Sequence, residues 1–274
     1  MPPRPRAHVL DRPRTGSPVA QHGGTTAAAR RTGEIPAERH TAGVATTRTT
    51  EILSEVARGD AEDAVLPGRL VASCARALPI TGVGLVLMTD AGPAGMVAAS
   101  DGVASTLEEL QFTLGEGPCV DCSTSGRPVL VPFLAGVGGA QWPAFTTGAL
   151  GADVAAVFAF PLRVGGIRLG VLDLYRDVTG PLTGPGLAEA LSFADAATTV
   201  LLHLQAHARE GAPIAVVEDR TEVHQATGMV SVQAGVPLAS ALVLLRARAF
   251  ATERPVLDLA RDVLSRLVRF DDEA

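Results

Sequence analysis

Two apolar runs of strand length, VAAVFAFPL and IRLGVLDLYR, lie between residues 154 and 176 and are separated by the turn RVGG. Gly165 and Gly166 supply the positive φ that a tight hairpin needs, so the two runs are predicted to pair antiparallel. A second pair of short apolar runs, GVGLVLM and GMVAAS, lies between residues 82 and 100 and flanks another turn. The chain is therefore expected to build on an antiparallel sheet.

Helical segments are predicted around these hairpins, at VLPGRLVASCARAL, TLEELQF and WPAFTTGALGA, with one more strand at PVLVPFL. A long helix is expected from Gly186 to about Arg209, and its apolar stripe is longer than one sheet needs. Part of the stripe is therefore predicted to pair with a second subunit. This order of elements indicates an α+β sandwich on an antiparallel sheet.

Three shorter amphipathic helices are predicted at residues 219–233, at 238–252 and after Pro255. Such helices with short joints can bury one small core. Gly228 lies inside the first of them, where glycine costs about 1 kcal/mol relative to alanine. We expect it to allow close helix packing; the alternative is that its bare backbone admits a nucleic acid.

Composition places the chain among globular proteins, with 47% apolar and 19% charged residues. No apolar run approaches the about 20 residues of a membrane span, and no signal peptide is evident, so a cytoplasmic protein without membrane contact is expected. Residues 1–48 hold eight arginines against three acids and no periodic apolar pattern, which predicts a disordered basic arm.

Residues 49–209 resemble the GAF sensory domain of actinobacterial regulators through LGEGPCVDCSTSGRPVLVPFL, WPAF and AFPLRVGGIRLGVLDLYR. Residues 210–274, through HQATGMVSVQAGV and the two helices after it, resemble the ANTAR domain, a small helical bundle that binds RNA in transcription antiterminators. The resemblance implies a GAF-like antiparallel sheet sandwich followed by an all-α three-helix ANTAR bundle. It also implies a signal-responsive, non-enzymatic regulator that binds a structured hairpin of nascent RNA as a homodimer.

The candidate RNA-binding residues lie on the last three predicted helices or their joints: Gln225, Thr227, Gly228, Arg246, Arg248, Arg254 and Arg261. Thr227 stands where the family commonly has lysine, which removes one phosphate contact. Asp258 and Arg261, and likewise Asp262 and Arg266, have the spacing of ordinary surface ion pairs. Seven arginines against nine acids after residue 213 lack the basic footprint of a nonspecific nucleic-acid binder. Only Phe250 and Phe270 are available there to stack on bases.

Candidate ligand or redox residues of the sensor are Cys119, Cys122, Phe112 and Trp142. The chain has no lysine, which excludes the Asn-Lys-Phe-Asp-Glu signature of cyclic-nucleotide GAF domains, and no histidine between residues 49 and 202 to hold a haem. A small apolar ligand or none is expected, with no cofactor.

The pair Cys119 and Cys122 leaves several interpretations open. The two thiols are structural, or they form a redox sensor. A third interpretation is a reductase like the GAF-type free methionine sulfoxide reductases, which needs nearby carboxylates such as Glu116 and Asp121. A zinc site lacks a second Cys-x-x-Cys.

Two further points concern the rest of the chain. His203 and His207 are expected to be surface residues without a metal, because no third ligand is visible in the sequence. The weak positive charge of the last three helices also keeps a protein-partner dimerisation module as an alternative to RNA binding.

Overall fold

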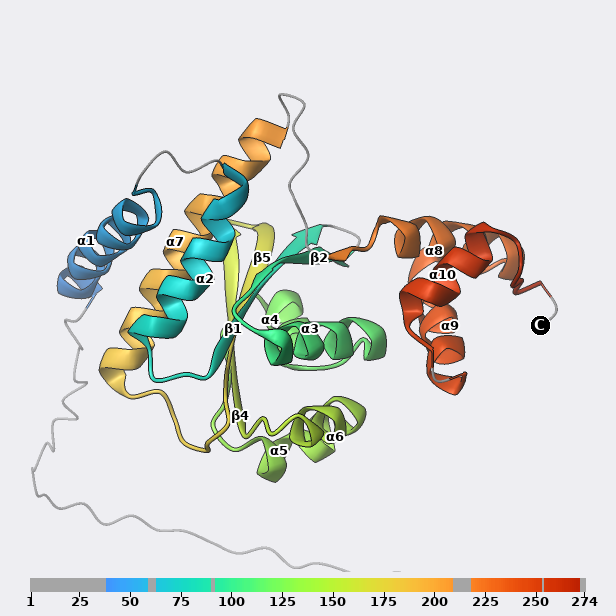
Figure 1. The fold of residues 1–274 in the computed structure, drawn as a ribbon, viewed down its shortest axis with the longest axis horizontal. Coiled ribbons are helices and arrows are strands. Elements are labelled where there is room, and N and C mark those ends of the chain that lie inside the picture. Colours follow the sequence, from blue (N-terminus) through green and yellow to red (C-terminus); the bar gives the residue numbers. More distant parts are fainter. Residues whose placement is uncertain (1–37, 59–62, 90–91, 209–217, 253, 272–274) are drawn as a thin grey trace, which may run out of the picture. The chain divides into compact units, whose positions relative to one another are not determined.

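The computed structural model describes residues 38–58, 63–89, 92–208, 218–252 and 254–271 (Figure 1). Most of the predicted basic arm therefore lies outside the described residues. Helix α1 (Glu38–Val56) nevertheless begins inside the segment 1–48 that the sequence assigned to that arm.

One antiparallel sheet organises the fold, with the strand order β3-β4-β5-β1-β2-β6. Its strands are β1 (Gly82–Thr89), β2 (Gly92–Ala99), β3 (Val129–Val131), β4 (Ala156–Val164), β5 (Ile167–Arg176) and β6 (Glu218–Asp219). Both predicted hairpins are confirmed, because β1 pairs with β2 and β4 pairs with β5. Gly165 has the expected positive φ, 59°. Strand β6 was not predicted; it joins the edge of β2 just before the last three helices.

Helices cover both faces of the sheet (Figure 1). On one face lie α2 (Leu66–Ala77), which follows the short 3-10 helix η1 (Asp63–Val65), and α7 (Gly184–Ala208). On the other lie α3 (Gly102–Leu114) and α4 (Pro118–Ser125), with α5 (Leu134–Gln141) and α6 (Pro143–Gly151) beyond them. Helix α5 was not expected, since LAGVGGAQ contains three glycines and has no amphipathic pattern.

Side chains that alternate along the strands pack into hydrophobic cores on the two faces of the sheet. The larger core lies under α2 and α7 and includes Phe158 and Phe160 of β4 together with Phe193 of α7. Because successive strand residues point to opposite faces, Val171 and Asp173 of β5 point toward α3 and α4 instead. That second face contains Cys119 and Cys122 among the candidate sensor residues.

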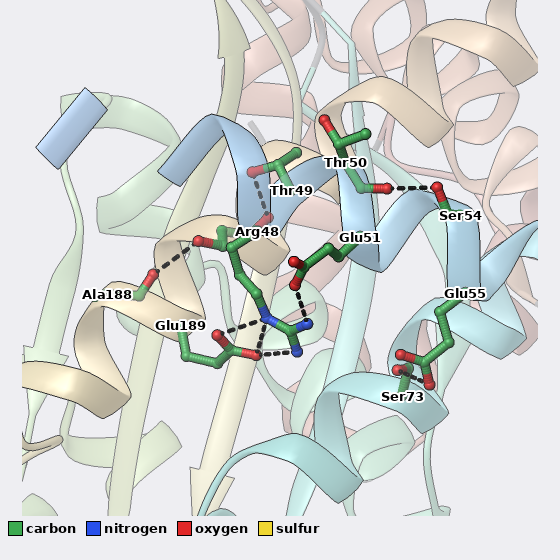
Figure 2. Close-up of polar contacts among 10 residues, drawn as sticks. Arg48, Thr49, Thr50, Glu51, Ser54, Glu55, Ser73, Ala188 and Glu189 are labelled. Carbon is green, nitrogen blue, oxygen red and sulfur yellow. Dashed lines mark hydrogen bonds and ion pairs between the residues drawn. The ribbon is translucent and has the colours of Figure 1, made fainter. Parts of the chain in front are cut away.

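Helix α1 is held against α7 by a paired contact between Arg48 and Glu189 (Figure 2). Nε and Nη2 of Arg48 donate to Oε1 of Glu189 at 2.9 and 2.6 Å, and Nη1 reaches Glu51 at 3.1 Å. These hydrogen bonds raise the pKa of Arg48, the one to Glu189 most. Ser73 of α2 donates to Glu55 of α1 at 3.2 Å, so α1 is tied to both helices of this layer (Figure 2).

Helix α7 departs from one expectation. Its segment Gly184–His207 is long and apolar enough to span a membrane by length and composition, and the bent pair of helices after β6 passes the same test, whereas no such run was expected. Half of this apolar stretch of α7 is buried, and Phe193 and Leu201 pack on the sheet. Leu191 and Leu202 of the predicted apolar stripe and its flank are exposed.

Three helices close the described chain: α8 (Thr221–Ala234), α9 (Leu238–Ala251) and α10 (Val256–Leu264). They lie near the predicted positions and enclose one core. Its buried members are Val223, Ala226, Val230, Ala241, Leu245, Ala249, Val256, Leu259, Ala260, Val263 and Phe270, with Phe112 of α3 among them.

Candidate functional site

The glycine-rich loop between α3 and α4 places Cys119 over the sheet. Gly115 ends α3 with φ 69°, and Gly117 precedes α4 with φ 135°, both conformations that favour glycine. Pro118 occupies the first turn of α4, where a proline is tolerated. The resulting reversal brings the first turn of α4, with Cys119, onto Gln111 of α3, whose Oε1 accepts a hydrogen bond from the Cys119 backbone N–H at 2.7 Å.

Asp173 is the one acidic residue of strand β5, and it lies on the same face as Val171. Its partners in the neighbouring strands are Gly84 of β1 and Ala159 of β4. Both are small, so they leave the sheet open around the carboxylate. A Cβ at Gly84 would meet Oε1 of Glu108 at 2.8 Å, so the glycine makes room for the Glu108 side chain.

Glu108, Cys119 and Asp173 form a buried cluster on this face, with their ligand-type atoms all within 4.8 Å of one another. Their exposed fractions are 3%, 2% and 5%. Neither carboxylate oxygen of Asp173 has a hydrogen-bond partner of ordinary geometry in the described chain. Gln111 Nε2 lies 3.5 Å from Oε2 of Glu108. Buried carboxylates are normally well hydrogen-bonded, so this arrangement requires an explanation.

The electrostatics of the cluster favour protonated groups. Burial raises the pKa of Asp173 to about 6, although contacts with Cys119 and Glu108 act in the opposite direction. Burial also raises the pKa of Cys119 well above its ordinary range, and the charges of Asp173 and Glu108 raise it further. Burial therefore disfavours the charged forms of Asp173 and Cys119.

The thiols do not match a reactive pair. Cys119, Cys122 and Cys74 are all buried and none is in a disulfide. Burial raises the pKa of Cys122 and of Cys74 as well. A reactive thiol normally has a lowered pKa and partial exposure, so this resting state favours neither the redox sensor nor the reductase.

The carboxylates suggested for a reductase have other roles. Glu116 accepts hydrogen bonds from the backbone N–H groups of Ala144 and Phe145 at the start of α6, at 2.8 and 2.9 Å. Asp121 accepts one from Nε1 of Trp142 at 3.2 Å. Glu108 and Asp173, which no sequence motif indicated, lie beside Cys119 instead.

The four candidate sensor residues are divided among three places. Cys119 and Cys122 pack together above β4 and β5. Trp142 is buried in a separate core with Phe145 and Val157. Phe112 lies in the core of the last three helices. The residues therefore do not line one common pocket, and Phe112 has a linking position instead.

Phe112 contacts two arginines that belong to the C-terminal helical segment. The guanidinium of Arg220, which directly precedes α8, lies 3.7 Å from the ring centroid, and that of Arg246 of α9 lies 5.2 Å from it. Arg220 is 4% exposed, donates to the backbone oxygen of Glu108 at 3.4 Å and lies 3.6 Å from Glu109. Burial, followed by repulsion from Arg220, lowers the pKa of Arg246 to about 10.

Gly228 does not serve close helix packing, contrary to expectation. A Cβ built at this position would meet nothing within 4 Å. The glycine instead lines an open groove of about 720 Å³ on the helical segment. Residues that line this groove, hereafter the Gly228 groove, are Gln225, Gly228, Met229, Val232, Gln233, Leu264, Arg266 and Arg269. They include two arginines and no acid, and one of these arginines, Arg269, pairs with Asp271.

Arg266 at the rim of the Gly228 groove has φ 61°, an uncommon conformation for a residue with a side chain. It lies two residues after the end of α10, and its backbone N–H donates to the oxygen of Val263 at 3.0 Å. Gln233 accepts a hydrogen bond from the backbone N–H of Phe270 at 3.0 Å, which fixes the last described turn beside the groove. A strained backbone conformation of this kind is common at binding sites.

The remaining RNA candidates have partners inside the protein. Arg254 pairs with Asp262 at 2.7 Å, and Arg261 pairs with Glu222 at 2.9 Å and with the predicted Asp258 at 3.5 Å. Asp262 was expected to pair with Arg266. Separately, Arg248 donates to the backbone oxygen of Arg269 at 2.9 Å.

Two predicted RNA contacts are placed away from the surface. Thr227 is 5% exposed, and its hydroxyl donates to the Val223 backbone oxygen at 2.7 Å, so position 227 faces the core. Phe270, expected to be available for stacking, is 1% exposed and packs under the guanidinium of Arg248. Phe250 is 65% exposed.

A second cluster with metal-ligand chemistry lies at the surface of the other layer. Asp63 of η1 supplies the third group that the sequence did not reveal beside His203 and His207. Nε2 of His203 lies 2.8 Å from Asp63 Oδ1, and Nδ1 of His207 lies 3.7 Å from Oδ2. The hydrogen bond with His203 lowers the pKa of Asp63. The contact between His203 and Asp63 also has the geometry of an ordinary exposed ion pair.

Comparison with known proteins gives backbone likenesses only. No family model matches the chain, and no curated protein matches it. Among solved structures, the GAF domain of an Acinetobacter phosphoenolpyruvate-protein phosphotransferase is 10% identical with a TM-score of 0.48, over 61% of this chain and 98% of that one. The corresponding domain from Coxiella burnetii is 18% identical with a TM-score of 0.48, over 60% and 96%.

A type II free methionine-R-sulfoxide reductase from Thermoplasma acidophilum also matches, at 16% identity and a TM-score of 0.38, over 50% of this chain and 92% of that one. The matched structures thus include both GAF domains of larger proteins and an enzyme. At these identities and TM-scores they carry no argument about what this chain binds or catalyses.

Proposed function

We propose that this chain is a cytoplasmic, non-enzymatic regulator in which the sheet domain senses a signal and controls RNA binding by helices α8 to α10. The resemblance to GAF and ANTAR domains supplies the expected setting, transcription antitermination, with a homodimer holding a hairpin of nascent RNA. The proposal assigns binding to the Gly228 groove and sensing to the face of the sheet that carries Asp173.

The observation that carries the proposal is the position of helix α3. Glu108 of this helix belongs to the buried cluster with Cys119 and Asp173, and Gln111 binds the Cys119 backbone. Phe112, the residue after Gln111, is 2% exposed and packs in the core of α8 to α10. A ligand that moves α3 therefore perturbs the helical core directly. Coupling of this kind requires two states that the ligand stabilises unequally.

The Gly228 groove has features that suit RNA. Arg266 and Arg269 contribute to the lining of the groove, and guanidinium binds phosphate in a bidentate way. Arg269 also pairs with Asp271, so an RNA phosphate would share or replace that partner. Gln225 is exposed and offers both a donor and an acceptor to base edges. The bare backbone at Gly228 lets a base or phosphate approach closely. With little surrounding positive charge, recognition should depend on a folded hairpin more than on a single strand.

The test is binding of the purified full chain to a pool of structured RNA hairpins at two salt concentrations, with and without reductant. We expect selective binding that weakens with salt. Arg266→Ala and Arg269→Ala should each lower the affinity and reduce the salt slope by about one, because each phosphate contact contributes about one to that slope.

The matched control is Arg254→Ala, whose guanidinium pairs with Asp262 outside the groove lining. It should leave the affinity and the salt slope nearly unchanged. Equal losses in all three variants would indicate diffuse electrostatics instead of a groove. No RNA binding in any condition would reject the RNA reading and favour the protein-partner dimerisation module.

A further inference from the structure

The buried cluster of Glu108, Cys119 and Asp173, on α3, α4 and β5, does not take part in the proposed contacts with RNA. It brings two carboxyl groups and one thiol together at 95% burial or more, with ligand-type atoms all within 4.8 Å. The Asp173 oxygens have no hydrogen-bond partner of ordinary geometry among the described residues. A buried carboxylate without such a partner requires an explanation, and a bound ion is one of those that chemistry offers.

The fold builds the room for this cluster. Gly84 and Ala159 flank Asp173 in the sheet, and a side chain at Gly84 would collide with Glu108 at 2.8 Å. The amide of Gln111 fixes the backbone of Cys119 at 2.7 Å and so sets the direction of the first turn of α4. Three groups from three different elements therefore converge on one point.

We infer that Glu108, Cys119 and Asp173 form a binding site for one divalent cation of the zinc class, and that this ion is the signal the sheet domain senses. The regulatory half of this inference rests on the proposed function; the binding half does not.

The donor set decides the class of ion. A thiolate selects soft or borderline cations, which excludes magnesium and calcium as the preferred occupants. Zinc accepts thiolate and carboxylate ligands together, and three protein ligands are the number found in sites that keep one position open. On binding, the Cys119 thiol releases its proton to solvent as the bond from Sγ to the metal forms, and any proton held between the two carboxyl groups is released as well.

Binding would also act on α3. Bonds from the ion to Glu108 and Asp173 draw α3 and β5 together, whereas without an ion these like groups repel one another or share a proton. Phe112 follows Glu108 one helical turn later and packs into the core of α8 to α10. Occupancy of the site thus has a direct route to the RNA-binding helices.

The first experiment titrates the full chain with Co²⁺ after treatment with a chelator, in a His203→Ala, His207→Ala background. That background removes the surface cluster with Asp63, which is a competing set of metal ligands. We expect one Co²⁺ per chain, with a thiolate-to-cobalt charge-transfer band that Zn²⁺ abolishes by displacement. Cys119→Ser should lose the band, and Asp173→Asn and Glu108→Gln should weaken binding by about tenfold or more.

Cys74→Ser is the matched control, because Cys74 is a buried thiol in the opposite core and should leave the band intact. Circular dichroism verifies that each variant is folded, and the near-isosteric Asp173→Asn keeps the test informative if Cys119→Ser does not fold. Absence of bound Co²⁺, or a thiolate band that persists in Cys119→Ser, would overturn the site and leave a proton-sharing cluster.

The second experiment measures RNA affinity with and without one equivalent of Zn²⁺. A change in the parent that is absent in Asp173→Asn supports the ion as the signal; equal affinities with the site occupied overturn that role. If no RNA binds at all, the proposed function fails, while the cobalt spectrum still decides the metal site.

Discussion

The guanidinium of Arg220 lies 3.7 Å from the ring centroid of Phe112, so a residue just before α8 stacks on a residue near the end of α3. Both side chains are almost fully buried. A buried cation over an aromatic face is stabilising, and the same arginine also reaches the backbone oxygen of Glu108. The contact joins the candidate sensor helix to the candidate RNA-binding helices through two residues.

Replacement of Phe112 tests how strongly these helices depend on α3. Phe112→Ala should lower the free energy of unfolding by about 3 to 5 kcal/mol, the usual cost of removing a buried phenyl ring. Chemical denaturation followed by far-ultraviolet circular dichroism measures the change. Phe133→Ala is the matched control, because Phe133 is 54% exposed and should cost far less. Similar losses in both variants would contradict a special role for Phe112.

Replacement of Gly228 is expected to increase stability, in contrast to replacement of Phe112. Gly228→Ala should raise the free energy of unfolding by about 1 kcal/mol, since alanine is the better helix former and its Cβ enters open space. The same variant should weaken RNA binding by filling the floor of the groove. Gly148→Ala in α6 is the control: its Cβ would meet Leu110 Cδ1 at 2.8 Å, so it should gain no stability. A destabilised Gly228→Ala would restore the packing interpretation.

The sequence predicted the elements better than the surfaces. Both hairpins, the long α7 and the three C-terminal helices follow from apolar periodicity and glycine turns, which are local signals. The direction that Gly228 faces depends on how α8 meets α10, and no local pattern records it. For the same reason, Thr227 and Phe270 were placed at the surface although both are buried.

The candidate site shows the same limit. Cys119 was found because Cys-x-x-Cys is a visible motif, whereas its partners Glu108 and Asp173 come from distant segments. One signal was present: an aspartate within the apolar run IRLGVLDLYR, on the face that points to α3 and α4. A charge in a buried strand is rare without a partner or a function. Asp63 beside His203 could not be found in this way, because a surface aspartate is ordinary.

Thiol reactivity separates a redox sensor from the arrangement described here. All three cysteines are buried with raised pKa values, so a thiol reagent such as Ellman's reagent should react very slowly with the native protein. Three thiols per chain should appear once denaturant unfolds it. Rapid reaction of Cys119 or Cys122 in the native state would instead support redox sensing.

The pH dependence of stability tests the buried carboxylate in the metal-free protein. The folded-state pKa of Asp173 is about 6, above its ordinary value of 3.8, so the folded chain retains a proton that the unfolded chain loses between these values. Its stabilising contribution is complete below about pH 4 and is lost as pH rises through 6, with a total on the order of 3 kcal/mol.

Asp173→Asn carries no charge at any pH, so this variant should be more stable than the parent at pH 7.5, and the difference should shrink toward pH 4. Urea denaturation at several pH values measures it. One equivalent of Zn²⁺ should stabilise the parent more than the variant at pH 7.5, because an amide is a poor substitute for a carboxylate ligand. If Asp173→Asn is less stable than the metal-free parent at pH 7.5, the Asp173 carboxylate is stabilised by contacts within the protein. That result would contradict both the raised pKa of Asp173 and its proposed role as a metal ligand.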